Sequence, residues 1–164
     1  MEFASLLKSQ AIGYDLKMDK HIDIRLADSP EDKALARRIR QQIFVEEQGI
    51  PADVEEDGLN ETAVHVLLDI AGTTAGTARM CLLENNEGEI ARVAITTEFR
   101  GRGLGKLLVE ALEKVAVEKK LERVFLHPHH YLEKFYAGLD YVLVPGESTS
   151  AGEHRLITME KKLP

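Results

Sequence analysis

Seven consecutive residues combine three cations with three glycines in a pattern that predicts an anion site. They read Arg100-Gly101-Arg102-Gly103-Leu104-Gly105-Lys106 and stand between a strand-like run and an amphipathic helix. Glycines let a backbone approach a ligand closely, and the start of a helix offers unpaired N–H groups and a positive dipole end. A phosphate ligand, most naturally a pyrophosphate, suits such a loop. The alternative is a glycine-rich turn that only links the strand to the helix.

The spacing of this loop excludes two common classes of nucleotide-binding site. A Walker loop requires glycine where Arg100 stands and serine or threonine where Leu107 stands. A dinucleotide fingerprint requires its third glycine where Lys106 stands, and it follows a first parallel strand rather than the meander of strands expected here. The loop is therefore expected to hold the phosphates of a different ligand.

The pattern around the loop predicts one sheet with helices packed against it. The clearest helix follows the loop, with an apolar stripe formed by Leu104, Leu107, Leu108, Ala111, Leu112 and Val115. A second helix is expected from Pro30 to about Glu46, and a short one over 131–139. Strands are expected at 21–27, 63–70, 77–83, 89–95, 123–126, 141–144 and 154–159. This order of elements is typical of an α+β or α/β fold.

The composition excludes several classes of partner. The chain has 164 residues, about one domain by length, and a formal net charge of −7. An acidic chain is a poor partner for nucleic acid or an anionic membrane, and no apolar run approaches the about 18 residues that cross a bilayer. The one cysteine, Cys81, excludes an intrachain disulfide and a cysteine-rich zinc site. We expect a cytoplasmic protein, with residues 1–20 as an N-terminal arm or extra helix and 21–164 as a single domain.

The spacing Arg-x-x-Gly-x-Gly, at Arg100, Gly103 and Gly105, resembles the pyrophosphate loop of the Gcn5-related N-acetyltransferases, the GNAT superfamily. The resemblance extends from about residue 21 to residue 163. The run 92–95 is similar to the family's splayed strand, whose backbone receives the pantetheine arm of acetyl-coenzyme A. The cofactor-binding residues that the resemblance implies are Val93, Ala94, Ile95, Arg100, Gly101, Arg102, Gly103, Leu104, Gly105 and Lys106.

Two further parts of the sequence carry the same resemblance. The run Lys134–Tyr141 is similar to the family's tyrosine segment, although Asp140 stands where glycine is usual. The parts that resemble ElaA-like members of the superfamily are Arg40, Ile43–Gln48, Pro51, Glu56-Asp57, His65 and Glu147–Met159. In the last of these, Ala151-Gly152-Glu153 replaces the usual Gly-Ile-Pro.

The resemblance implies a GNAT fold, an α+β architecture of the α/β sandwich type. In this fold a mixed, mostly antiparallel central sheet is flanked by helices, and splayed strands hold acyl-CoA. It also implies an acetyl-CoA-dependent N-acetyltransferase that moves the acetyl group directly to an amine in a ternary complex. No metal is expected, because the thioester is already activated. The alternatives are a non-catalytic acyl-CoA sensor with this fold, and a partner-binding domain whose loop holds another anion.

The same resemblance assigns chemistry to three side chains. An amine acceptor must lose a proton before attack, and a base with a pKa near neutral removes it best. His154 is the first candidate for this base and His65 is the second; either histidine has the alternative role of orienting substrate or packing. Tyr136 takes the general-acid position toward the leaving thiolate, with a buried core tyrosine as its alternative.

Other titratable residues leave the acceptor open. The cluster His127-Pro128-His129-His130 has no accompanying cysteines, so we expect it to flank the cleft rather than to hold a metal. The acidic stretch 53–61 is either an attraction for a cationic acceptor or a solvated charged surface, and Glu46 and Glu47 are another candidate lining. The acceptor can be a small amine, an aminosugar, an amino-acid analogue or a peptide amine. Many family members dimerise, so a homodimer is compatible with the resemblance.

Overall fold

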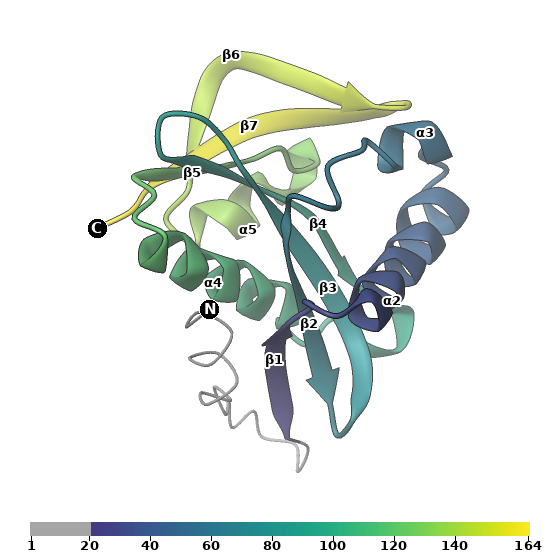
Figure 1. The fold of residues 1–164 in the computed structure, drawn as a ribbon. Coiled ribbons are helices and arrows are strands. Elements are labelled where there is room, and N and C mark those ends of the chain that lie inside the picture. Colours follow the sequence, from purple (N-terminus) through teal and green to yellow (C-terminus); the bar gives the residue numbers. More distant parts are fainter. Residues whose placement is uncertain (1–20) are drawn as a thin grey trace.

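A seven-stranded sheet forms the centre of the computed structural model, which describes residues 21–164 (Figure 1). The order across the sheet is β1-β2-β3-β4-β5-β7-β6; β4 and β5 are parallel, and the other paired neighbours are antiparallel. The strands are β1 Ile22–Leu26, β2 Val64–Ile70, β3 Thr73–Leu82, β4 Glu87–Ile95, β5 Arg123–Leu126, β6 Val142–Ala151 and β7 His154–Lys162. The mixed, mostly antiparallel sheet confirms the predicted fold class. The arm or helix predicted at 1–20 lies outside the described residues.

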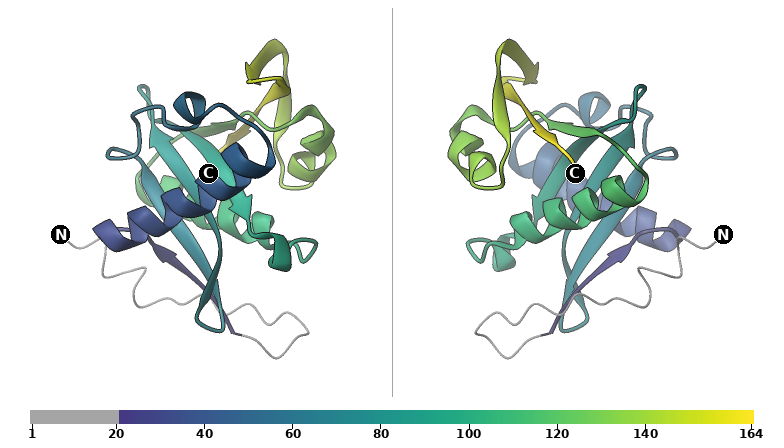
Figure 2. Two further views of the ribbon diagram at one scale, coloured as in Figure 1. Left: turned by 90° about the vertical axis from the view of Figure 1, so that its right-hand side faces the viewer. Right: turned by 90° about the vertical axis from the view of Figure 1, so that its left-hand side faces the viewer.

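Helices cover both faces of this sheet (Figures 1 and 2). They are α2 Pro30–Arg40, the π-helix η1 Gln41–Glu47, α3 Ala52–Glu55, the 3-10 helix η2 Thr97–Phe99, α4 Leu104–Glu118, the 3-10 helix η3 His130–Leu132 and α5 Glu133–Ala137. Leu67 of β2 packs with Ala36 of α2, whereas Val66 and Leu68 belong to the main core, which includes α4. Because successive side chains of a strand point to opposite faces, α2 and α4 lie on opposite sides of the sheet.

The first helix begins where the sequence predicts and then changes its pitch. The side chain of Ser29 accepts a hydrogen bond from the N–H of Asp32 at 3.1 Å, and Pro30 opens the helix. From Gln41 the helix continues as a π-helix to Glu47, a wider winding that hydrophobic spacing alone does not reveal.

The C-terminal hairpin is longer than the sequence predicts. The sequence predicts a strand only over 141–144, but the stretch that follows is also part of β6. This strand pairs with β7 from Val142 to Ala151 across an irregularity between Leu143 and Ser148. This strand lies at the edge of the sheet and most of its residues are exposed. An exposed edge strand needs no apolar alternation, so periodicity gives no signal for it.

Two central strands separate partway along their length. The parallel strands β4 and β5 pair only from Glu87↔Arg123 to Glu89↔Phe125 in the described chain. On its other side β4 stays paired with β3, through a bulge in which Arg92 and Val93 both lie opposite the one residue between Thr77 and Arg79. Arg92 adopts a φ of 56° in this bulge. The separation opens the sheet between β4 and the segment that follows β5.

No helix within residues 21–164 is long and apolar enough to cross a bilayer.

Candidate active site

The gap between β4 and β5 contains a cavity of about 340 Å³. One wall is the half of β4 from Glu89 to Val93, and the other is the segment from Leu126 to His129. Other lining residues come from η1, α3 and the segments that follow them, from β6 and β7, and from the short helices η3 and α5, among them Tyr136. The cavity therefore lies where the edge of β4 loses its strand partner.

The glycine loop stands beyond the end of β4 and opens α4. Gly101 and Gly103 have φ values of 75° and 73°, which side chains rarely adopt, and a Cβ at either position would meet no atom within 4 Å. Glycine is thus required here by the backbone and not by crowding. Gly103 is the N-cap of α4 and provides no side-chain cap, so no side chain at this position satisfies the first N–H groups of the helix.

The cations of the loop are tied to nearby groups and remain near the surface. Arg100 donates from Nε to the carbonyl oxygen of Ile95 at 2.8 Å and pairs through Nη2 with Glu47 at 2.8 Å. Arg102 donates to the carbonyl oxygen of Glu98 at 3.1 Å. These contacts join the loop to the end of β4 and to the π-helix, and they leave the start of α4 facing outward with positive charge around it.

Tyr136 lies in the cavity wall with its ring buried. Its side chain is 6% exposed, and the rings of Phe135 and Tyr141 pack edge-on against it at 4.9 and 5.9 Å between centroids. Its hydroxyl makes no hydrogen bond to any described residue, whereas the hydroxyl of Tyr141 donates to Glu113. Burial raises the pKa of Tyr136 to about 12. The phenol is therefore protonated at neutral pH and able to donate a proton into the cavity.

His129 is a histidine of the cavity wall, and His154 stands behind it. The two rings meet edge to face with 5.0 Å between centroids, and Tyr131 stacks on His129 at 5.1 Å. Burial, followed by the neighbouring imidazoles of His154 and His130, lowers the pKa of His129. His154 does not itself line the cavity; its Nε2 lies 2.8 Å from the carbonyl oxygen of Gln48.

The structure does not bring His65 to this cavity. His65 lies on β2, is 4% exposed, and has its Nε2 at 2.8 Å from the carbonyl oxygen of Asn60. It lines a separate hollow beside α2, together with Lys33 and Arg37. Burial lowers its pKa. Of the three predicted catalytic side chains, Tyr136 is thus in the cavity wall, His154 is behind the wall and His65 is elsewhere.

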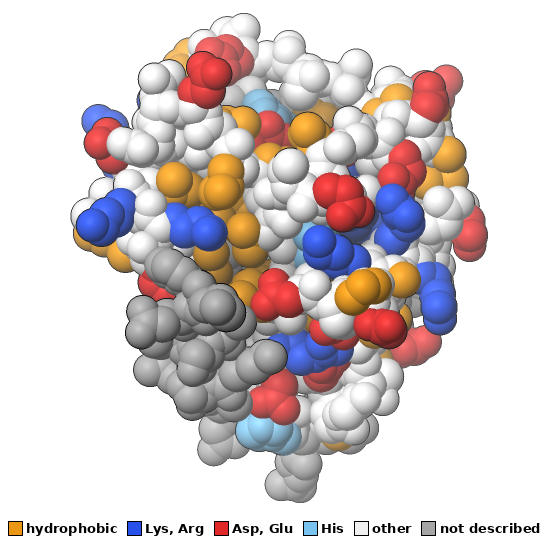
Figure 3. All heavy atoms as spheres, viewed as in Figure 1, with side chains coloured by type: hydrophobic (Ala, Val, Ile, Leu, Met, Phe, Trp, Pro, Cys, Tyr) orange, Lys and Arg blue, Asp and Glu red, His pale blue; other side chains and the backbone are white. Residues whose placement is uncertain are grey.

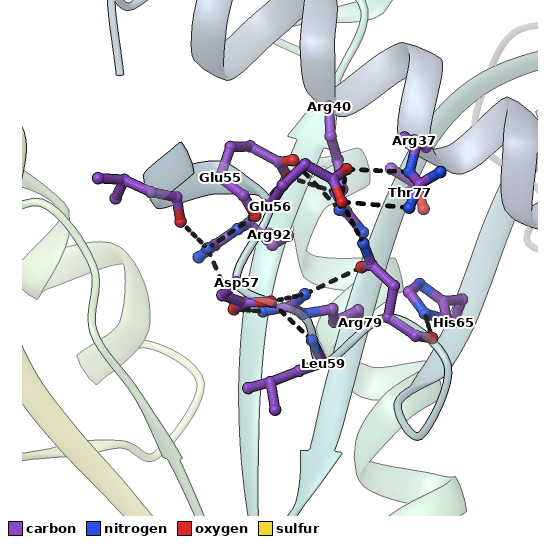
Figure 4. Close-up of polar contacts among 12 residues, drawn as sticks. Arg37, Arg40, Glu55, Glu56, Asp57, Leu59, His65, Thr77, Arg79 and Arg92 are labelled. Carbon is purple, nitrogen blue, oxygen red and sulfur yellow. Dashed lines mark hydrogen bonds and ion pairs between the residues drawn. The ribbon is translucent and has the colours of Figure 1, made fainter. Parts of the chain in front are cut away.

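The acidic stretch forms a paired network at the cavity wall (Figure 4). Glu55 and Arg40 are each 1% exposed, and Arg40 donates from Nε to Glu55 Oε1 at 2.5 Å. Asp57 pairs with Arg79, which donates from Nη1 at 2.9 Å. Burial by itself would raise the pKa of Asp57, but the hydrogen bonds from Arg79 hold it below its usual range. Glu55 is therefore a buried charge, whereas Asp57 is exposed, and both carboxylates are paired with arginines of this chain rather than free to bind a cationic acceptor.

The outer part of the same stretch differs. Glu56 pairs with Arg37 at 2.9 Å near the surface, and Asp53 and Glu61 are exposed. On the face seen in Figure 3, acidic and basic side chains intermingle over α2 and α3.

Two side chains of the cavity wall were not found by sequence reasoning. Glu89 is half-buried and lines the cavity, and its carboxylate has no hydrogen bond or ion pair to any residue of 21–164. Arg92 lines the same cavity, three positions along β4. Side chains three apart on a regular strand face opposite ways. The bulge at Arg92 is what brings Glu89 and Arg92 to the same side of β4. No local sequence pattern predicts this bulge.

Within the described chain, no group of three or more His, Cys, Asp or Glu side chains is arranged to hold a metal ion. His127, for instance, contacts the hydroxyl of Thr158 through Nδ1 at 3.1 Å.

Comparison with known proteins shows which family this chain matches. Residues 32–141 match the model of the acetyltransferase (GNAT) family. A candidate acetyltransferase of Bacillus subtilis (strain 168), BSU40680, is 32% identical over 123 residues, which cover 73% of this chain and 83% of that protein.

Solved structures agree in fold. The chain is similar to an acyl-CoA N-acyltransferase from Pseudomonas aeruginosa, with a TM-score of 0.74 and 25% identity over 85% of this chain and 99% of that one. It is also similar to Escherichia coli ElaA, with a TM-score of 0.75 and 21% identity over the same shares of the two chains.

Proposed function

Because the chain belongs to the acetyltransferase (GNAT) family, we propose that it is an acetyl-CoA-dependent N-acetyltransferase that transfers the acetyl group directly to an amine in a ternary complex. The observation that carries this proposal is one continuous path. The unpartnered edge of β4 begins at the cavity that holds Tyr136 and ends at the glycine loop of α4. The named activity of the similar acyl-CoA N-acyltransferase supports the same choice of donor.

The residues along this path fit the proposed donor. The glycine loop 100–106 offers unpaired N–H groups and cations to a pyrophosphate. The half of β4 that includes Val93, Ala94 and Ile95 has no strand partner on the β5 side, so its backbone can pair with the amide groups of an extended arm. Acetyl-CoA supplies a thioester that is already activated, and no metal is required.

In this proposal, groups of the protein move the protons of the reaction and stabilise the charge that develops on the acyl oxygen. His129, neutral at pH 7 because its pKa is lowered, accepts the proton that the attacking amine loses. A backbone N–H of β4 near Val93 to Ile95 stabilises the oxyanion that develops on the acyl oxygen. As the carbon–sulfur bond breaks, the protonated phenol of Tyr136 donates its proton to the leaving sulfur.

This assignment moves the base from His154, the sequence-based choice, to His129, whose ring packs against it. His154 becomes a positioning residue, since it packs against His129 and reaches the cavity only through it. His65 has no route to the cavity in this scheme. We keep the cytoplasm as the proposed compartment, where the free, buried thiol of Cys81 stays reduced.

The test is release of the CoA thiol from acetyl-CoA in the presence of a panel of amines. We expect that one class of amine is acetylated, and that the amount of CoA thiol released equals the amount of acetylated product formed. Acetyl-CoA binding with no turnover for any amine would instead support a sensor.

A further inference from the structure

Arg92 lies in a network where positive charge exceeds negative charge. Three guanidinium groups, from Arg40, Arg79 and Arg92, face the two carboxylates of Glu55 and Asp57. Arg40 and Arg79 are the closer partners of these carboxylates, and Arg92 stays at 3.4 Å or more from both. The outer pair of one arginine and one glutamate leaves the same excess of one positive charge. Arg92 is therefore the cation with the weakest compensation.

The donors of Arg92 are largely unused. Its Nη2 donates to the carbonyl oxygens of Val54 at 3.1 Å and Glu55 at 3.3 Å, and to Asp57 Oδ2 at 3.4 Å. Its Nε is buried, lies 3.5 Å from Glu55 Oε1 and has no hydrogen-bond partner. Its Nη1 makes no hydrogen bond to any described residue. Since a guanidinium carries five N–H donors in a fork that matches a carboxylate, this side chain has donors left for an incoming anion.

The surroundings make the positive charge of Arg92 unfavourable. Burial and then the charge of Arg79 lower the pKa of Arg92, although an arginine stays protonated at neutral pH. Its side chain is 24% exposed and lines the cavity that also holds Tyr136. The bulge in β4 holds Arg92 at the cavity wall with a φ of 56°, a backbone conformation that residues other than glycine rarely adopt. The cation is thus fixed at the wall and not free to turn to solvent.

We propose that Arg92 binds a carboxylate of the acceptor, so that the acceptor is a small amine that also carries a carboxylate, an amino acid in the broad sense. This inference rests on the proposed N-acetyltransferase function. The cavity of about 340 Å³ suits a small molecule. The unpaired carboxylate of Glu89 in the same wall is complementary to the ammonium form of such an acceptor.

The experiment compares each of the twenty L-amino acids with its own primary amide, by thiol release at saturating acetyl-CoA. Rates are compared at equal concentrations of free amine, since amidation lowers the pKa of the amino group. For the best acceptor we expect the acid to exceed the amide in kcat/KM by about tenfold or more, the value of a hydrogen-bonded charge pair. In Arg92→Gln the ratio of acid to amide should fall to about one.

Two controls separate recognition from damage. Arg37→Gln removes an arginine of the same network that does not line the cavity, and its acid-to-amide ratio should match the native one. Arg92→Lys keeps a charge without the fork and should give an intermediate ratio. Thermal unfolding of each variant shows whether the fold is kept.

A binding readout keeps this inference distinct from the proposed function. Addition of the preferred acid to the CoA-loaded protein should raise the melting temperature in the native chain and not in Arg92→Gln. Equal rates and equal shifts for acids and amides, or a native ratio in Arg92→Gln, would overturn the inference while the acetyltransferase remains. Acids that shift the melting temperature through Arg92 without any thiol release would contradict the proposed function and leave the carboxylate site standing.

Discussion

The arginines at the two ends of the open half of β4 differ in how their charges are satisfied. Arg100 and Arg102, beyond the C-terminal end, are exposed; both bond to carbonyl groups four or five residues away, and Arg100 also pairs with Glu47 near the surface. Arg40 and Arg79, at the other end, are 1% exposed and pair with carboxylates 15 and 22 positions away in sequence. Exposed cations are suited to the exchangeable binding of a polyanion. Buried pairs instead fix the shape of a wall.

The largest effect on stability should come from breaking the buried Arg40–Glu55 ion pair. Arg40→Met leaves Glu55 buried with only the more distant Arg92 beside it. Removal of one partner of a buried ion pair costs about 3–5 kcal/mol. We expect a loss of that size in the free energy of unfolding, measured by urea denaturation. The outer pair gives the matched control, because Arg37→Met should lose at most about 1 kcal/mol.

A double variant sharpens this result. Arg40→Met combined with Glu55→Leu removes both charges, and apolar replacements of a buried pair are often neutral. Most of the lost stability should return. Equal losses in Arg40→Met and Arg37→Met would mean that the buried Arg40–Glu55 pair contributes no more to stability than an exposed pair.

The exposed end should respond in binding rather than in stability. Gly103→Asp places a negative charge and a strained φ at the start of α4. We expect the Kd for acetyl-CoA to rise about a hundredfold or more, since a negative side chain is added beside the positive dipole end that attracts a pyrophosphate. Calorimetric titration measures this change.

Gly72→Asp is the control for Gly103→Asp. Gly72 has a φ of 83° and open space around its Cβ position, but it lies in the turn between β2 and β3. Both variants should lose about 1–2 kcal/mol of stability from the left-handed backbone. Native acetyl-CoA affinity in Gly103→Asp would show that the loop is only a connector.

Tyr136 lies between the two ends and should affect turnover alone. Tyr136→Phe removes a hydroxyl that has no hydrogen-bond partner among the described residues, so unfolding should change little. We expect kcat to fall about a hundredfold, the usual size of a general-acid contribution, with the Kd for acetyl-CoA unchanged. Steady-state thiol release with the best acceptor measures kcat. An unchanged kcat would assign Tyr136 to packing.

The smallest effect should be a shift of a pH profile. The lower limb of kcat/KM reports the pKa of His129, which burial and then His154 hold below its ordinary value of 6.5. In His154→Gln the imidazole neighbour is gone, so the pKa of His129 rises and the limb moves to higher pH by less than about one unit. A limb that stays in place, or one that survives in His129→Gln, would contradict the assignment of the base.

Local patterns made one end of β4 predictable from sequence. The glycine loop, the apolar stripe of α4 and the start of α2 at Pro30 each depend on neighbours within a few residues, and each stands where the sequence places it. The mixed sheet follows from the order of the elements. The resemblance to a family supplied Tyr136, which the cavity wall contains.

The other end depends on contacts that no local pattern encodes. Glu55 is indistinguishable in sequence from its solvated neighbours, and its burial follows from an arginine on another helix. Arg92 faces the cavity only because β4 bulges there. His129 and His154 are 25 positions apart in the numbering and meet because the hairpin folds back over the end of β5. These tertiary contacts decide which of several histidines and carboxylates can act.

The most direct test of the whole account is calorimetric titration of the protein with acetyl-CoA, with free CoA and ATP as comparison ligands. The account predicts saturable binding of acetyl-CoA at one site, and weaker or no binding of ATP. A folded protein that binds no acetyl-CoA would contradict it, because the glycine loop and the open edge of β4 would then serve another purpose.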